Sequence, residues 1–152
     1  MASNKLSEVY KNVISDAKQV VKEELDKVMK DEFKTQAEKI YDVYDPINPH
    51  TSRHRDGIDG SYADEENIVS ENKELENGIE YKVYDVRKTD CDCAYCTSKE
   101  IYLDYLIENG IAGNTSIPDR PTSQWVAESV EDNDLVRKTI VEGMKNKGWK
   151  TE

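Results

Sequence analysis

Apolar residues recur at helical spacing along the N-terminal part of the chain, which contains neither Gly nor Pro before Pro46. They run from Leu6 and Val9 through Phe33 to Tyr44, while Lys alternates with Asp and Glu at the remaining positions. This pattern predicts one amphipathic helix over residues 4–44. Such a helix would be about 60 Å long, whereas a compact chain of this size is roughly 40 Å across. We therefore expect it to bend, break or project, and a projecting apolar stripe needs cover from another subunit.

A Pro- and Gly-containing stretch without periodicity follows, and we predict that residues 45–66 form a long ordered loop. The loop carries Arg53, His54 and Arg55, the only concentrated positive charge in the chain. Two interpretations remain open. The arginines either form local ion pairs with nearby aspartates or dock onto an acidic neighbour.

The middle of the chain predicts a β-hairpin over residues 67–88. Ile79, Tyr81 and Val83 alternate with polar residues or Tyr84 after the turn signal Asn77-Gly78. The first strand is so polar that its register against the second stays undecided. Polar strands usually lie at the edge of a sheet.

Two further helices are predicted in the C-terminal half. The first spans residues 99–109 and stops at Asn109-Gly110. A turn containing Pro118 and Pro121 precedes the second, over residues 119–147, whose apolar stripe begins at Trp125 and which ends before Gly148. The predicted fold is α+β, a single domain over 1–152. It has a long N-terminal helix, a small antiparallel sheet with a β-hairpin, a short middle helix and a long C-terminal helix packed on the sheet.

Composition narrows the function classes. The 152 residues fit one domain. The formal charge of −11, with 21 Lys and Arg against 32 Asp and Glu, disfavours nucleic-acid and anionic-membrane binding. No apolar run is long enough to span a bilayer, and the N-terminal residues lack the apolar block of a signal peptide. The low hydrophobic content of 36% indicates that neighbouring copies complete part of the apolar surface.

A cysteine cluster lies in the predicted loop 89–98. Cys93 and Cys96 have the CxxC spacing that grips zinc from one turn, and Cys91 adds a third thiol. His54, or His50, would have to complete a Cys3His site. The alternatives are free thiols in a reducing compartment and a redox pair, which is disfavoured because no thioredoxin-like pattern surrounds the cysteines. We expect no cofactor, with zinc as the one candidate.

Catalytic motifs give no support for an enzyme. The sequence contains no EF-hand loop, no phosphate-binding GxxxxGK or GxGxxG loop and no GxSxG elbow. Its only histidines, His50 and His54, lie in the loop after the first helix. We therefore expect a non-enzymatic protein.

The order of these features resembles the tail-component family of long-tailed bacteriophages, the small neck or tail-completion proteins found between head and tail. The resemblance covers most of the chain and rests on short motifs: Val43-Tyr44-Asp45-Pro46, Arg53-His54-Arg55-Asp56-Gly57-Ile58, Asp64-Glu65-Glu66-Asn67-Ile68, Leu106-Ile107-Glu108-Asn109-Gly110, Ile117-Pro118-Asp119-Arg120-Pro121 and Gly143-Met144-Lys145-Asn146-Lys147-Gly148-Trp149. Ser52, His54 and Thr122 depart from the family pattern, as does the cysteine cluster.

The resemblance implies a virion protein of the neck or tail, assembled in the host cytoplasm. It would form a homo-oligomer, a hexameric ring at the top of the tail tube. Its partners would be the head-side connector or stopper and the tail terminator or tail-tube proteins, without membrane or sequence-specific nucleic-acid binding. DNA would pass through an acidic channel without sticking. The expected interface residues are Tyr44, Arg53, Arg55, Arg120 and Trp125.

Two other functions remain as alternatives. One is a small metal- or thiol-responsive regulatory protein built on Cys91, Cys93 and Cys96. The other is a helical oligomeric adaptor that dimerises through its first helix.

Overall fold

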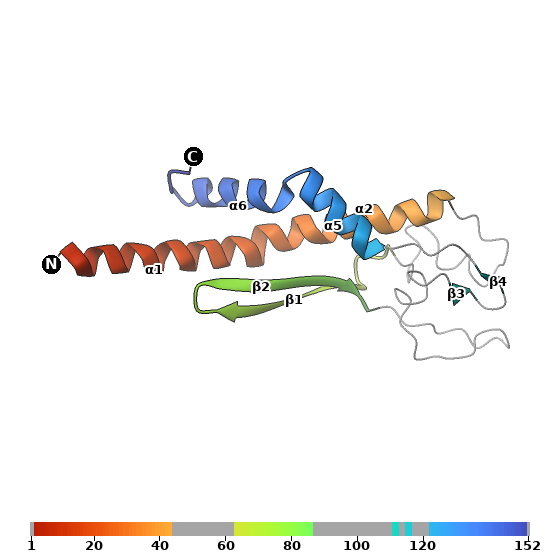
Figure 1. The fold of residues 1–152 in the computed structure, drawn as a ribbon, viewed down its shortest axis with the longest axis horizontal. Coiled ribbons are helices and arrows are strands. Elements are labelled where there is room, and N and C mark those ends of the chain that lie inside the picture. The colour runs from red at the N-terminus through yellow and green to blue at the C-terminus, as the bar shows by residue number, and fades with distance from the viewer. Residues whose placement is uncertain (1, 44–62, 87–110, 113–114, 117–121, 152) are drawn as a thin grey trace.

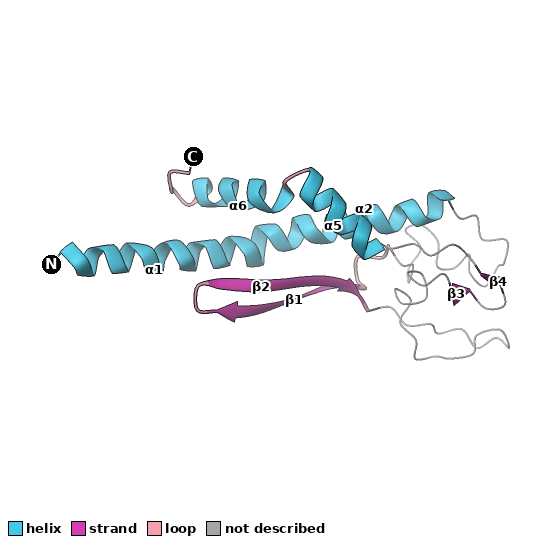
Figure 2. Ribbon diagram, in the orientation of Figure 1, coloured by secondary structure: helices cyan, strands magenta, loops and turns pink. Residues whose placement is uncertain are grey.

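The computed structural model describes residues 2–43, 63–86, 111–112, 115–116 and 122–151. These residues form an α+β fold, as predicted, but the C-terminal segment, predicted to pack on the sheet, packs mainly on the N-terminal helix. A long N-terminal helix lies between a two-stranded antiparallel sheet and two C-terminal helices (Figure 1). Helices account for most of the described residues (Figure 2).

The N-terminal helix is continuous but contains one irregular turn. It consists of α1 (Ala2–Val20), the π-helical segment η1 (Val21–Leu25) and α2 (Asp26–Val43), which together we call the rod. In η1 the backbone N–H of Asp26 donates to the carbonyl of Val21, five residues earlier. This bond inserts an extra residue into the turn. The predicted helix over 4–44 is thus confirmed within the described residues.

The π turn suits the spacing of the apolar row. From Val13 to Ala37, apolar residues recur at every fourth position through Val21 and Phe33. In a regular helix, each four-residue step advances about 40° beyond a full turn. The row therefore winds around the rod and meets different neighbours along it, and the wider turn offsets part of the winding. Along the rod, α1 and η1 contact α6, whereas α2 contacts α5 and the hairpin.

The hairpin pairs β1 (Ile68–Leu75) with β2 (Gly78–Asp85). Ile68 pairs with Asp85 and Leu75 with Gly78, which settles the register that the sequence left undecided. The turn is Glu76-Asn77, one residue earlier than the predicted Asn77-Gly78. Tyr81 and Val83 are half-buried beside the exposed Glu80 and Lys82, so the predicted alternation is confirmed.

The predicted C-terminal helix over 119–147 is two helices, α5 (Thr122–Asp132) and α6 (Leu135–Asn146). They are separated at Asn133-Asp134, where Asp134 has a left-handed φ of 53°. Asp tolerates this conformation better than most residues do. The predicted stop at Gly148 is confirmed, because its φ of 88° and the bond from the Trp149 N–H to the Met144 carbonyl end the helix.

The hydrophobic core lies where the rod, the hairpin and α5 meet. Its buried members are Phe33, Ala37, Ala63, Ile68 and Val126. Met29, Val83, Trp125 and Val130 pack against this cluster. The hairpin and α5, which are far apart in the sequence, therefore pack against the same stretch of α2.

A short strand pair was not predicted. β3 (Ile111–Ala112) pairs antiparallel with β4 (Thr115–Ser116). The Gly113-Asn114 dipeptide between them in the sequence is the hairpin signal that could have indicated it.

Candidate functional site

Most residues singled out from the sequence lie outside the described part of the chain. This holds for the candidate zinc ligands Cys91, Cys93, Cys96 and His54, for the interface candidates Tyr44, Arg53, Arg55 and Arg120, and for the predicted helix 99–109. Most of the loop 45–66 and all of the loop 89–98 lie there too. These assignments remain predictions.

Trp125 is the one candidate interface residue that the structure describes. It lies on α5, is half-buried and packs against the core cluster. At least part of the indole therefore contributes to the fold of the single chain.

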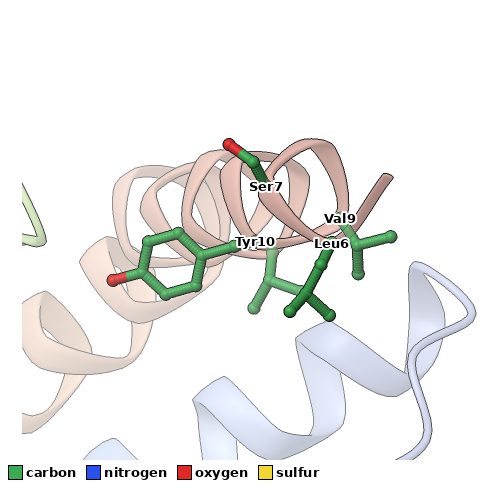
Figure 3. A pocket seen from close by; sticks show the side chains of 5 residues that line it. Leu6, Ser7, Val9 and Tyr10 are labelled. Atoms are coloured by element: carbon green, nitrogen blue, oxygen red, sulfur yellow. The ribbon is translucent and has the colours of Figure 1, made fainter. Parts of the chain in front are cut away.

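An uncovered apolar surface lies at the start of the rod. We call it the α1 tip, formed by Leu6, Val9, Tyr10 and Val13. Leu6 is 75% exposed, Tyr10 55% and Val9 49%. Figure 3 shows Leu6 and Val9 on the side of α1 that faces the C-terminal helix, while Ser7 points away. The N-terminal end of α1 extends beyond the C-terminal end of the chain (Figure 1), and the Tyr10 hydroxyl reaches Asn77 Oδ1 in the hairpin turn at 3.4 Å.

The tip is uncovered because the C-terminal segment stops short of it. The Trp149 indole N–H donates to Asp16 Oδ2 at 2.8 Å, and Lys147 Nζ donates to Gln19 Oε1 at 2.8 Å. These bonds fix the end of α6 beside the last turns of α1. Beyond this point on α1, Leu6 and Val9 remain exposed, whereas the Tyr10 hydroxyl donates to Asn77 in the hairpin turn.

A second apolar surface lies where α5 and α6 meet. We call it the α5–α6 groove. It has an open volume of about 670 Å³ and is lined by Ala127, Val130, Glu131, Asp134, Val136, Arg137, Ile140 and Val141. Val136 is 37% exposed. Arg137 Nη1 forms an ion pair with Asp134 Oδ2 at 3.1 Å.

The sequence analysis missed this groove because it placed these apolar residues on one stripe of a continuous helix. The break at Asn133-Asp134 turns that stripe into a corner. The run Asp132-Asn133-Asp134 was the available signal, since Asn and Asp are poor helix formers that favour turns.

A polar cluster joins the hairpin to the rod at the π turn. We call it the polar clamp: Asp26, Lys30, Ser70 and Tyr81. Asp26 Oδ1 accepts hydrogen bonds from the Ser70 hydroxyl and, at 3.1 Å, from the Tyr81 hydroxyl. Lys30 Nζ lies 2.9 Å from Asp26 Oδ2. Asp26 is half-buried, and these bonds offset the cost of removing part of its charge from water.

The clamp changes the acidity of its members. Burial raises the pKa of Asp26, but the hydrogen bonds from Ser70, Lys30 and Tyr81 outweigh it, so the pKa lies below its ordinary value. Burial, together with the Asp26 charge, raises the pKa of Tyr81. Asp26 therefore stays ionised and Tyr81 stays protonated at neutral pH, which keeps the hairpin fixed to the rod.

The described residues were compared with what metal binding and membrane crossing require of side chains and helices. No cluster of His, Cys, Asp and Glu side chains there is arranged to hold a metal ion. None of the described helices combines the length and the apolar character needed to cross a bilayer.

Comparison of the chain with protein-family models, curated proteins and solved structures found no match.

Proposed function

We propose that this chain is a non-enzymatic structural subunit of a bacteriophage neck, which assembles into a ring joining the tail to the head connector. The phage assignment rests on the resemblance of the sequence motifs to the tail-component family. The assembly role is supported by one structural observation, the uncovered α1 tip.

The tip supports assembly because its exposure is costly for a chain that stays alone in water. Burying a Leu or Val side chain stabilises a protein by roughly 1.5–3 kcal/mol relative to leaving it exposed. Single exposed apolar residues are ordinary, but Leu6, Val9 and Tyr10 form one contiguous surface on consecutive turns of α1. A neighbouring copy would remove this surface from water.

Charge fits the same role. The chain carries a formal charge of −11. A ring of such subunits would surround its channel with negative potential, which repels the phosphates of passing DNA. The outer edge of the polar strand β1 offers a second site at which copies could join.

The test is native mass spectrometry of the purified chain, alone and mixed with head-connector and tail-tube proteins of a phage that encodes it. We expect a hexamer in at least one mixture, and a ring when that species is viewed by electron microscopy. A dimer that never grows would instead support the helical adaptor. A monomer in every mixture would overturn assembly, and adjacent genes without capsid, connector or tail functions would overturn the phage assignment.

A further inference from the structure

The described part of the chain has two uncovered apolar surfaces of different shape. The α1 tip is a ridge on a single projecting helix, whereas the α5–α6 groove is the corner between two helices. We infer that the α1 tip of one copy docks into the α5–α6 groove of the next copy. This inference rests on the proposed assembly of the chain with itself and names the contact that would carry it.

The spacing of the tip residues matches one way in which helices are recognised. An amphipathic helix docks in an apolar groove through residues at positions i, i+3, i+4 and i+7. Leu6, Val9, Tyr10 and Val13 have this spacing, so they lie on one face over roughly 10 Å of helix. The groove lining of Val130, Val136, Ile140 and Val141 supplies the apolar partner.

The tip cannot reach the groove of its own chain. α5 packs on α2, and α6 packs on η1 and on the C-terminal part of α1, where Gly143 lies against Val20, so the groove is held over the rod from Val20 onward. From Tyr10 to Val20 the rod rises roughly 15 Å without a break. The two surfaces can therefore meet only between copies.

The charges beside the two surfaces are of opposite sign. Lys5 precedes the tip, and Glu131 lies in the groove together with the Asp134–Arg137 ion pair. Among the described residues, neither Lys5 nor Glu131 makes a side-chain hydrogen bond or an ion pair. Opposite charges at the edge of an interface contribute little to affinity but favour one orientation.

A tip-to-tip pair fits these observations less well. It would leave the α5–α6 grooves of both copies uncovered. A tip-to-groove contact is heterologous, so each copy offers one surface to each of its two neighbours. Repetition of such a contact closes a ring when the rotation allows it.

The decisive experiment is photo-crosslinking from the tip. A benzophenone amino acid replaces Val9, which is 49% exposed, in the full-length chain, and isotopically heavy and light copies are mixed, irradiated and digested. We expect crosslinks of mixed isotope composition that join the tip to residues 127–141. Mixed crosslinks to residues 2–13 or elsewhere would overturn the docking inference and leave assembly standing. Same-copy crosslinks only, in a mixture in which the chain assembles, would also overturn the docking inference, whereas a monomer in every mixture would overturn assembly as well.

A matched pair of variants measures the strength of the contact. Leu6→Ser should weaken association by about tenfold or more, because a largely exposed leucine loses its burial in the groove. Glu8→Ser is the control, since Glu8 is exposed and falls on the opposite face of the same helix by its spacing. Circular dichroism should show that both variants are folded. Equal association of both variants would contradict the inference.

Charge-reversal variants at Lys5 and Glu131 give a separate test of the same contact. Lys5→Glu and Glu131→Lys should each weaken association, and the two together should restore it. Lys11→Glu, the same change on the other side of α1, should have less effect than Lys5→Glu. If the double variant associates no better than the single ones, these charges do not face each other in the assembly.

Discussion

Gly143 is the position where α6 comes closest to the rod, and Gly143→Ala tests that packing. A Cβ added at Gly143 would lie 2.5 Å from Val20 Cγ1, 2.9 Å from Val20 Cγ2 and 3.0 Å from Glu24 Oε2. Val20 is completely buried, and a valine in a helix has one strongly preferred rotamer. The valine therefore cannot turn aside, so α6 has to move away from the rod.

Two opposing effects determine how much Gly143→Ala changes the free energy of unfolding. Overpacking a close contact costs about 1–3 kcal/mol, and the short distances at Gly143 favour the upper half of that range. Alanine gains about 1 kcal/mol over glycine within a helix. We therefore expect a net loss of about 1–2 kcal/mol in the free energy of unfolding.

Urea unfolding, followed by far-UV circular dichroism at fixed protein concentration, measures this difference. Gly78→Ala is the matched control, because a Cβ there has no atom within 4 Å. It should be neutral or stabilising by up to about 1 kcal/mol. Val20→Ala combined with Gly143→Ala should be more stable than the sum of the single changes, because the smaller residue makes room for the added methyl. A Gly143→Ala variant that is as stable as the wild type would refute the close approach.

Other predictions concern the clamp, the indole and the cysteines. The folded state lowers the pKa of Asp26, so the Asp26 carboxylate stabilises the fold fully above the ordinary aspartate pKa of about 3.9. This stabilisation is lost as the pH falls through the folded pKa. In Asp26→Asn, the free energy of unfolding should therefore depend less on pH in this range. Because the folded pKa of Tyr81 is raised, the free energy of unfolding should fall as the pH rises above about 10, and Tyr81→Phe should remove that dependence. Trp125→Ala should cost about 2–4 kcal/mol in urea unfolding, whereas the exposed Gln124→Ala should cost about 0.5 kcal/mol or less; a stable Trp125 variant would place the indole outside the core. Replacing Cys91, Cys93 and Cys96 with Ser should leave the oligomer mass unchanged, and loss of bound zinc together with assembly would instead favour the metal-responsive regulator.

The spacing of apolar residues in the sequence correctly predicted those helices and strands that are determined by their own residues. The helix over 4–44 follows from the apolar spacing and the absence of Gly and Pro, and the hairpin follows from the alternation at Ile79, Tyr81 and Val83. Both segments are present in the structure with small shifts at their ends. The local sequence pattern was therefore sufficient to predict these two elements.

Other features depend on contacts that no local pattern contains. The π turn at Val21–Leu25 serves an apolar row that must meet α6 on one side and α5 with the hairpin farther along. The groove depends on the left-handed Asp134, whose conformation the stripe of apolar residues does not reveal. The clamp joins Asp26 to Ser70 and Tyr81, which are distant in sequence, and their identities alone do not indicate that they meet.

The exposed position of Leu6 means that two parts of the rod are important for different reasons, one for the stability of the single chain and one for contact with a neighbouring copy. The buried residues of the rod begin at Val20 and the contact with α6 ends near Asp16, so the first turns of α1 add little to the stability of an isolated subunit. Changes at Leu6 or Val9 should therefore be almost silent in the unfolding of a lone chain. If the amino acids at Leu6 and Val9 are restricted among related chains, the restriction must come from the contact with a neighbouring copy. Substitutions at these two positions should then be accompanied by substitutions in the α5–α6 groove that receives them.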